Sequence, residues 1–590
     1  MAAEGQKVVL ITGCSSGIGL AIAVTLARDE MKRYYVIGTM RDLKRKDKLV
    51  EAAGDAYGKT LSLLTLDVCS DESVKQCVDN IKDRHIDILI NNAGVGLVGP
   101  VEGLSMDEMM AVFQTNFFGA VRMIKEVMPD MKKRQSGHII VVSSAMGLQG
   151  VVFNDVYSAS KFAIEGFCES LAVQLLKFNV TVSMIEPGPV HTEFEMKMFA
   201  DVSKKEYAGT DPETLHHFRT YYLPSAMNIF QGLGQSPEHI AKCTKKVIES
   251  PRPPFRNLTN PLYTPIVALK YADETGSLSV HTFYHVLYNL GGVMNTLTIR
   301  YSSEIMAAEG QKVVLITGCS SGIGLAIAVM LARDEMKRYY VIGTMRDLKR
   351  KDKLVEAAGY AYVNNAGVGL VGPVEALSLD DMKQVFETNF FGVVRMIKEV
   401  MPDMKKRRSG HIIVVSSVLG LHGVAFNDVY SASKFATEGL CEGLAIQLMK
   451  FNVNVSMIEP GPVNTEFELK LMTEVSKKEY VGTDPETLDH FRTCYLPTQV
   501  NLFQGLGQTP EDIAKVTKKV IESKRPPFRN LTNPLYTPIV ALKYADDTRS
   551  LSVHTFYHML YNLGGVMHVS VRIMKFLNFE WLRRRAISPT

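Results

Sequence analysis

Residues 7–19 read KVVLITGCSSGIG, an apolar run followed directly by a glycine-rich turn. The run predicts a buried strand, and residues 20–30, LAIAVTLARDE, predict a helix. Glycines between a strand and a helix allow a tight turn, and the helix N-terminus offers free N–H groups to a phosphate. The stretch therefore predicts the opening of a dinucleotide-binding fold, although glycines at such turns also occur for packing alone.

The same stretch occurs twice in the 590-residue chain. MAAEGQKVVLITGCSSGIGLAIAV begins at Met1 and again at Met306, an offset of 305 residues (306 − 1). From residue 90 onward the offset is 273 residues (430 − 157), so the second copy lacks the counterpart of residues 58–89. Because the chain is too long for one ordinary core, we expect two domains, 1–305 and 306–590.

The first copy alternates between strand-like and helix-like patterns. Continuous apolar strands that alternate with helices are typical of a parallel sheet covered on both faces. The sequence therefore predicts an α/β fold with two tandem Rossmann-like doubly wound parallel-sheet domains, the second lacking a central segment. The strands are expected at 7–13, 34–40, 62–68, 86–94, 138–144 and 180–188, and the helices at 20–30, 72–83, 109–127 and 157–178.

Composition narrows the classes of function. The net charge of +4 and the absence of a long basic run argue against nucleic-acid binding. Eight cysteines without a Cys-x-x-Cys pair indicate a reducing compartment, and no metal site is predicted. The chain starts directly with a strand-like run and contains no stretch of eighteen apolar residues. We therefore expect a cytoplasmic protein.

The second predicted strand ends at Arg41, where nicotinamide cofactors are distinguished. An acidic residue here suits the ribose 2′-hydroxyl of NAD, whereas an arginine suits the 2′-phosphate of NADP. Asp42 follows at once, so Arg41 could equally begin the solvated run RDLKRKDK. Together with Ser15 in the loop, Arg41 favours NADP(H). Asp67, which ends the third strand, is placed either to contact the adenine ring or to cap the next helix.

Tyr157 and Lys161 stand four residues apart on one predicted helix, so their side chains can converge. Ser144 ends a strand 13 residues before the tyrosine, at the sheet edge where α/β proteins bind ligands. A free phenol has a pKa of about 10, and a nearby ammonium favours its ionised form. A lone Tyr–Lys pair is more often surface decoration. Downstream of the glycine loop, the trio predicts proton exchange with a substrate oxygen that Ser144 hydrogen-bonds while nicotinamide exchanges hydride.

These motifs, with NNAG at 91–94 and EPGPVHT at 186–192, resemble the short-chain dehydrogenase/reductase family. The resemblance implies that Asn116 holds a water linking the catalytic lysine to solvent, that residues 187–192 hold the nicotinamide carboxamide, and that Arg41 reads the 2′-phosphate. The catalytic residues expected are Asn116, Ser144, Tyr157 and Lys161. The cofactor-binding residues expected are Thr12, Gly13, Ser15, Ser16, Gly17, Ile18, Gly19, Arg41, Asp67, Val68, Asn92, Ala93, Gly94, Lys161, Pro187, Gly188, Val190 and Thr192.

Longer stretches narrow the resemblance to the branch that contains retinol and 17β-hydroxysteroid dehydrogenases. They include NNAGVGLVGP, FNDVYSASKFAIEGFCESLA and GTDPETLHHF, and the match covers nearly all of residues 5–290. It implies NADPH-dependent reduction of all-trans-retinal to retinol, with 17β-hydroxysteroid carbonyls as the alternative. A binding or scaffold protein that keeps the fold without the chemistry is the alternative of another class.

Two further segments bear on a lipophilic substrate. Residues 194–230 mix Phe, Met and Tyr with charged residues, which predicts either a lid over an apolar ligand or an ordinary helical subdomain. The tail at 572–585, RIMKFLNFEWLRRR, combines apolar residues with arginines and could lie on an anionic membrane surface. The sequence is therefore consistent both with peripheral membrane association and with a purely cytoplasmic location.

The second copy keeps the motif residues but has no counterpart of Asp67. The missing segment carries the third strand and most of the fourth, which lies beside the first in a Rossmann sheet. Its loss would leave the first strand without a neighbour and its backbone unpaired, so the second copy is predicted to be inactive or misfolded. Its catalytic counterparts are Asn389, Ser417, Tyr430 and Lys434, and its cofactor-binding counterparts are Gly318, Gly322, Gly324 and Arg346.

Three accounts of the tandem stay open. The chain could join two neighbouring reading frames with one segment lost, as the internal MAAEGQK suggests. It could be a genuine fusion whose second half is a non-catalytic partner, docked like the second subunit of a dimer. Or the second copy could still bind cofactor weakly. Both a homodimer and an internal pseudo-dimer are consistent with these accounts.

Overall fold

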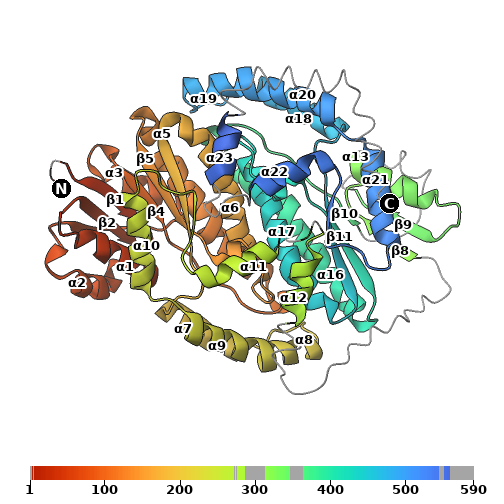
Figure 1. Ribbon diagram of the computed structural model, residues 1–590, viewed down its shortest axis with the longest axis horizontal. Coiled ribbons are helices and arrows are strands. Elements are labelled where there is room, and N and C mark those ends of the chain that lie inside the picture. The colour runs from red at the N-terminus through yellow and green to blue at the C-terminus, as the bar shows by residue number, and fades with distance from the viewer. Residues whose placement is uncertain are drawn as a thin grey trace.

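Each copy contains one parallel sheet, and in the computed structural model the two sheets lie on either side of the centre (Figure 1). The structure describes residues 3, 5–270, 273, 275–285, 312–345, 363–543 and 550–558. The first sheet has the strand order β3-β2-β1-β4-β5-β6-β7, with every pairing parallel. The predicted doubly wound α/β fold is confirmed. Its strands are β1 (Lys7–Ile11), β2 (Tyr34–Met40), β3 (Leu61–Thr65), β4 (Ile88–Asn91), β5 (Gly137–Val142), β6 (Val180–Glu186) and β7 (Arg256–Leu258).

The helices of the first copy cover both faces of this sheet, and polar residues begin many of them. Ser70 accepts a hydrogen bond from Ser73 N at the start of α3, and Ser105 and Glu108 form a capping box on α4. The helices are α1 (Gly17–Ala27), α2 (Asp47–Ala53), α3 (Asp71–Asp79), α4 (Met106–Phe113), α5 (Ala120–Lys133), α6 (Asp155–Leu175), α7 (Glu193–Lys204), α8 (Pro212–His217), α9 (Leu223–Leu233), α10 (Pro237–Glu249), α11 (Thr264–Leu269) and α12 (Ser277–His285).

The second copy also forms a sheet, with the order β13-β12-β11-β10-β8-β9. The expectation that its first strand would have no neighbour is wrong, because β10 lies between β8 and β11. However, β10 has only two residues and pairs with β8 only through Val363 and Ile316, whereas β4 pairs with β1 at three positions. The strands are β8 (Lys312–Ile316), β9 (Tyr339–Gly343), β10 (Val363–Asn364), β11 (Gly410–Val415), β12 (Val453–Glu459) and β13 (Arg529–Leu531).

The helices of the second copy repeat those of the first, without counterparts of α2 and α3 among the described residues. They are α13 (Gly322–Ala332), α15 (Leu379–Phe386), α16 (Gly392–Lys406), α17 (Asp428–Met449), α18 (Glu466–Lys477), α19 (Pro485–His490), α20 (Leu496–Leu506), α21 (Pro510–Glu522), α22 (Thr537–Leu542) and α23 (Ser550–Tyr557).

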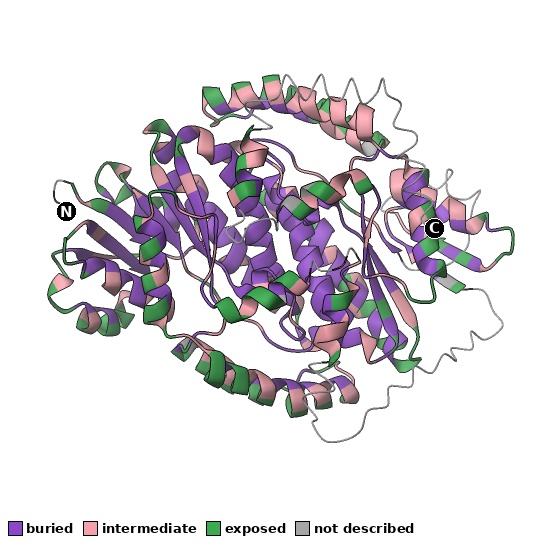
Figure 2. Cartoon of the chain, in the orientation of Figure 1, coloured by how far each residue is buried: buried purple, intermediate pink, exposed green. Residues whose placement is uncertain are grey.

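The two copies pack against each other through α6 and α17, which lie side by side at the centre of Figure 1. Every residue of α6 except Tyr157 is buried, and Figure 2 shows both helices buried along their length. Aromatic rings join the two cores. The ring centroids of Phe113 and Phe390 are 4.7 Å apart, and so are those of Phe117 and Phe386. One hydrophobic cluster therefore spans both copies.

Charged contacts across this interface come in matched pairs. Lys405 Nζ lies 2.8 Å from Thr214 Oγ1 on α8, and in the same way Lys132 Nζ lies 2.6 Å from Thr487 Oγ1 on α19. Each copy's α8 or α19 therefore contacts the long helix α16 or α5 of the other copy. This reciprocal arrangement has the form of a dimer interface within a single chain.

Candidate active site

The glycine loop joins β1 to α1 and has the geometry that a phosphate-binding turn requires. Gly13 has φ +72°, and a Cβ there would lie 3.0 Å from Ala93 Cα. A Cβ on Gly19 would lie 2.3 Å from Asn92 Nδ2, so any side chain would push the loop away from the neighbouring strand end. Ser16 is the N-cap of α1, and its side chain makes no capping hydrogen bond. The N-terminus of α1 therefore keeps N–H groups for an anion.

Hydrogen bonds hold this loop against the end of β4. Thr12 Oγ1 accepts from the backbone N–H groups of both Asn92 and Ala93, at 2.9 Å each. The Asn92 amide donates back to the carbonyl oxygens of Thr12 and Gly13, at 2.9 and 3.1 Å. The residues predicted to bind cofactor from two separate motifs thus lie together at the carboxyl edge of the sheet.

The residues expected at the adenosine end lie beyond this loop. Arg41 is exposed at the end of β2, while Asp42 accepts from Lys44 N at 2.9 Å and so caps a short 3₁₀ turn. The Asp67 carboxylate accepts from Cys69 N at 2.9 Å, whereas the N-cap of α3 is Ser70 rather than Asp67. Val68 is buried against Gly119, where a Cβ would lie 2.8 Å from its side chain.

The catalytic candidates converge where α6 meets the ends of β4 and β5. Ser144 follows β5, and Lys161 Nζ, buried on α6, donates to Val142 O at 3.0 Å. Asn116 Nδ2 donates to Ser160 Oγ at 3.0 Å and to Val95 O at 2.9 Å. Asn116 lies in a π-helical turn (Gln114–Gly119) between α4 and α5, and such turns often occur at functional sites.

Burial controls the protonation of this group. Burial raises the pKa of Tyr157 above its ordinary value, while a hydrogen bond from Ser144 lowers it and the Glu195 carboxylate raises it. Burial also lowers the pKa of Lys161 to about 8. The expected lowering of the Tyr157 pKa by a lysine ammonium is therefore outweighed by desolvation. Near neutral pH Tyr157 is a protonated phenol, which suits it to donate a proton.

The loop after β6 closes the site on the side of α7. Ala145 N donates to Pro187 O at 2.8 Å, and Val190 pairs with Gln235 in an isolated parallel bridge. Thr192 is the N-cap of α7, accepts from Glu195 N at 3.3 Å, and contacts the loop at Gly17. These positions are those expected to hold the nicotinamide end of a cofactor.

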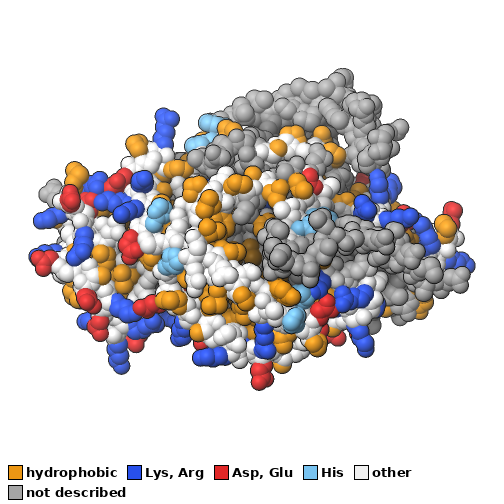
Figure 3. All heavy atoms as spheres, turned by 60° about the horizontal axis from the view of Figure 1, so that its bottom comes forward, with side chains coloured by type: hydrophobic (Ala, Val, Ile, Leu, Met, Phe, Trp, Pro, Cys, Tyr) orange, Lys and Arg blue, Asp and Glu red, His pale blue; other side chains and the backbone are white. Residues whose placement is uncertain are grey.

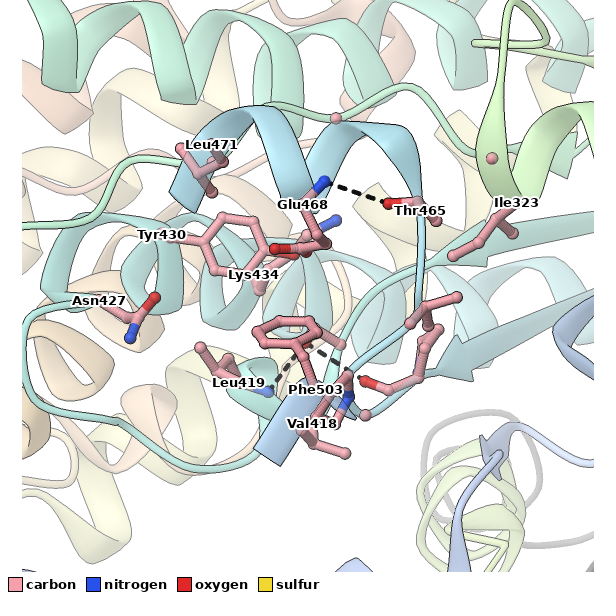
Figure 4. Close-up of a pocket in the computed structure, with 18 of the residues that line it drawn as sticks. Ile323, Val418, Leu419, Asn427, Tyr430, Lys434, Thr465, Glu468, Leu471 and Phe503 are labelled. Atoms are coloured by element: carbon pink, nitrogen blue, oxygen red, sulfur yellow. Dashed lines mark hydrogen bonds between the residues drawn. The ribbon is translucent and has the colours of Figure 1, made fainter. Parts of the chain in front are cut away.

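Glu195 is a site residue that the sequence patterns did not reveal. It follows the Thr192 cap by three residues, and burial raises its pKa to about 7. Its charge acts on the pKa of Tyr157. The stretch TEFE at 192–195 recurs at 465–468, where Figure 4 shows Glu468 beside Tyr430 and Lys434. The repeat offered a signal, but identical copies do not separate functional residues from structural ones.

The second copy reproduces the catalytic geometry of the first. Lys434 Nζ donates to Val415 O at 3.0 Å, and Asn389 Nδ2 donates to Ser433 Oγ at 3.0 Å. Gly318, Gly322 and Gly324 keep the loop conformation, with positive φ at the first two. Ser417, Tyr430 and Lys434 line one cavity together with Gly318 and Gly322. Arg346 lies outside the described residues.

Other groups that would signal different chemistry are not found in the described parts of the chain. No group of three or more His, Cys, Asp or Glu side chains there could hold a metal ion. Within the same residues, no helix is long and apolar enough to cross a membrane. The tail at 572–585 lies outside the described residues.

A nucleotide loop, a parallel sheet and a Ser–Tyr–Lys group at its carboxyl edge define a nicotinamide-dependent oxidoreductase. The short chain dehydrogenase family model matches residues 7–203 and 361–475, in both copies. The chain belongs to this family.

Curated relatives align with about half of this chain. Retinol dehydrogenase 8 of Bos taurus is 58% identical over 293 residues, which cover 50% of this chain and 94% of that protein. The 17-beta-hydroxysteroid dehydrogenase type 1 of Homo sapiens is 42% identical over 285 residues, covering 48% of this chain and 86% of that protein. Among solved structures, a short-chain dehydrogenase from Streptomyces avermitilis is 27% identical, with TM-score 0.36, and covers 43% of this chain and 88% of its own. The chain is an oxidoreductase with retinol and steroid dehydrogenases as relatives.

Proposed function

We propose that the first copy reduces all-trans-retinal to all-trans-retinol with NADPH. The observation that carries the proposal is the convergence of Ser144, Tyr157, Lys161 and Asn116 beside a glycine loop shaped for a phosphate. The retinoid is favoured over other lipophilic carbonyls by the 58% identity to retinol dehydrogenase 8. A 17β-hydroxysteroid substrate is the second candidate, favoured by the 42% relative.

The chain's own groups account for the proton in this reaction. Hydride for the carbonyl carbon is the chemistry that NADPH supplies when bound. The Tyr157 phenol donates its proton to the carbonyl oxygen, and Ser144 orients that oxygen by a hydrogen bond. Lys161, with a pKa of about 8, is protonated at neutral pH and can return a proton to the phenolate. Asn116 holds both the backbone of Val95 and the hydroxyl of Ser160, the residue before Lys161.

The pH dependence of reduction tests this proton path. Because the pKa of Lys161 is lowered to about 8, its ammonium is present below that pH and lost above it. We expect kcat for carbonyl reduction to fall as the pH rises through about 8, measured as NADPH oxidation. Glu195 titrates near 7, so the profile of Glu195→Gln is the control. An alkaline limb that disappeared in this variant would assign it to Glu195 instead.

Cofactor preference should depend on Arg41, which is exposed at the end of β2 where a 2′-phosphate would lie. Asp42, the neighbouring carboxylate, accepts from Lys44 N through Oδ1 as the cap of a 3₁₀ turn. We expect Arg41→Ala to raise the KM for NADPH by about tenfold or more, because a charge-assisted phosphate contact is lost. The KM for NADH should change by less than about twofold, by the same reasoning. Equal effects on both cofactors would contradict the assignment.

The substrate class is tested by a carbonyl panel with NADPH. Helices α7 and α9 carry exposed Met196, Met227, Ile229 and Leu233, on the side of the molecule turned forward in Figure 3, where hydrophobic side chains gather. These exposed apolar side chains on α7 and α9 support the interpretation of residues 194–230 as a lid. We expect kcat/KM for all-trans-retinal to exceed that for estrone by at least about tenfold, a difference that one or two apolar groups can supply. The reverse order would make the chain a steroid reductase.

We propose that the second copy contributes no turnover and that misfolding is not the reason. Its sheet closes through β10 and its catalytic contacts repeat those of the first copy. What the sequence lacks is the counterpart of Asp67 and Val68, which support the adenosine end. We propose that the copies act as an internal pseudo-dimer, 1–305 and 306–590, in the cytoplasm, with the tail at 572–585 as a membrane-surface contact.

A further inference from the structure

A large cavity lies in the second copy, with a volume of about 1680 Å³ (Figure 4). Pockets for small ligands usually measure about 300–1,000 Å³, so this one has room for more than one small molecule. It runs from the glycine loop past Tyr430 and Lys434 to the helices α18 and α20. The loss of the segment has therefore not collapsed the site.

The polar end of this cavity can hold a ligand oxygen. Ser417 and Tyr430 both line it, and the Ser417 hydroxyl lowers the pKa of Tyr430 by a hydrogen bond. Lys434, buried behind them, is held by Val415 O. A hydroxyl or carbonyl oxygen placed here meets the same donors as in the first copy.

Much of the remaining wall is apolar and comes from several elements, and Glu468 and Gln499 also line it. Leu471 on α18 and Phe503 on α20 lie near Tyr430 in Figure 4, and Leu419 and Phe556 also line the cavity. The first copy contributes Val173 from α6, so the pocket is completed by the other half of the chain. Such a wall suits an elongated hydrocarbon.

A sequence difference marks the inter-copy part of this wall. His422 stands where the first copy has Gln149, and its ring lies 4.1 Å from that of Phe556. His422 Nδ1 is 2.9 Å from Glu169 Oε1 on α6 of the first copy. The first copy has a counterpart of this contact, because Gln149 Nε2 donates to Glu442 Oε2 at 3.4 Å and Gly150 N donates to the same oxygen at 2.8 Å. The difference between the copies is therefore the imidazole ring that His422 adds to the wall of this cavity.

Cofactor binding, in contrast, has lost its support on the adenosine side. In the first copy a Cβ on Gly119 would meet the Val68 side chain at 2.8 Å, whereas among the described residues the nearest atom to a Cβ on Gly392 is the helix's own Glu387 O, at 3.2 Å. Arg122 pairs with Asp71 in the first copy, but Arg395 pairs with Glu387, at 2.7 Å, in the second. Glu387 replaces Gln114 and so supplies the carboxylate that the missing segment took away.

We propose that the second copy is a binding site for a lipophilic alcohol or carbonyl compound that works without a nicotinamide cofactor. Its ligand is an elongated apolar molecule with an oxygen at one end, held by Ser417 and Tyr430. The proposal rests on the proposed function only for its choice of ligand class. The second copy would then hold substrate or product for the first.

Binding stoichiometry of the full chain, with all-trans-retinol as the probe, tests the proposal. In equilibrium dialysis without cofactor we expect one equivalent that Phe503→Asp weakens at least tenfold and that Phe230→Asp, the matched change in the first copy, leaves in place. Helix α20 contains no buried residue, so Phe503→Asp should fold, which circular dichroism verifies. NADPH should bind at one equivalent per chain.

The outcomes separate this proposal from the enzymatic one. Retinol binding unaffected by Phe503→Asp, or two NADPH sites of equal affinity, would overturn the second-copy site. Turnover of retinal together with a retinol equivalent that Phe230→Asp weakens and Phe503→Asp does not would overturn it too, yet leave the enzyme function intact. A retinol equivalent that depends on Phe503, without any turnover of retinal, would support the site and refute the reductase.

Discussion

Replacing Tyr157 with phenylalanine should lower kcat for retinal reduction by about 10²–10⁴-fold, the usual contribution of a positioned proton donor. The change removes one oxygen atom, and the ring stays on α6, whose other residues are all buried. NADPH binding should persist, because the glycine loop and Thr12 contacts are untouched. The measurements are steady-state NADPH oxidation and a separate fluorescence titration of NADPH.

The internal repeat supplies the comparison for this experiment. Tyr430→Phe is the same change in an equivalent setting, with Lys434 placed as Lys161 is. If only the first copy turns over, the double variant should be no slower than Tyr157→Phe alone. A residual rate in Tyr157→Phe that disappears when Tyr430 is also changed would show that the second copy is active.

The fold of the first copy was predictable because its strands are continuous apolar runs. The sequence pattern placed a strand at 34–40, and β2 spans Tyr34–Met40. Strand β7 was missed, since its three residues, Arg-Asn-Leu, carry no alternation or apolar run. For the same reason β10, with two residues, could not be foreseen, and the second copy's sheet was expected to be broken at its centre.

The site divides along a similar line. Residue spacing brought Ser144, Tyr157 and Lys161 together, because helix and strand geometry convert spacing into position. It could not give the balance between burial and charge that sets the Tyr157 pKa, since desolvation depends on atoms distant in sequence. Nor could it show the contacts between copies, such as Lys132 with Thr487, which are 355 residues apart.

Stability should depend strongly on Arg256, the residue at the start of the unforeseen strand β7. Its guanidinium is buried and pairs with Glu165, with Glu186 at 2.8 Å and with Glu169 at 3.3 Å. These carboxylates are themselves buried, so removing the cation leaves uncompensated charge in the core. Arg256→Met should therefore lower the free energy of unfolding by about 3–5 kcal/mol, as measured by urea denaturation.

Two matched variants give this experiment its interpretation. Lys48→Met breaks an ion pair with Glu193 in which both side chains are more than half exposed, and should cost less than about 1 kcal/mol. Arg529→Met removes the equivalent buried cation of the second copy, which pairs with Glu442 and Glu459 at 2.6 Å each. Glu169 also contacts Lys543 at 2.7 Å, and Glu442 contacts Lys270 at 2.5 Å, so each cluster extends into the other copy. Because the clusters share the interface, Arg256→Met and Arg529→Met should shift one common transition. Two separate transitions, each moved by only one variant, would show that the copies unfold independently.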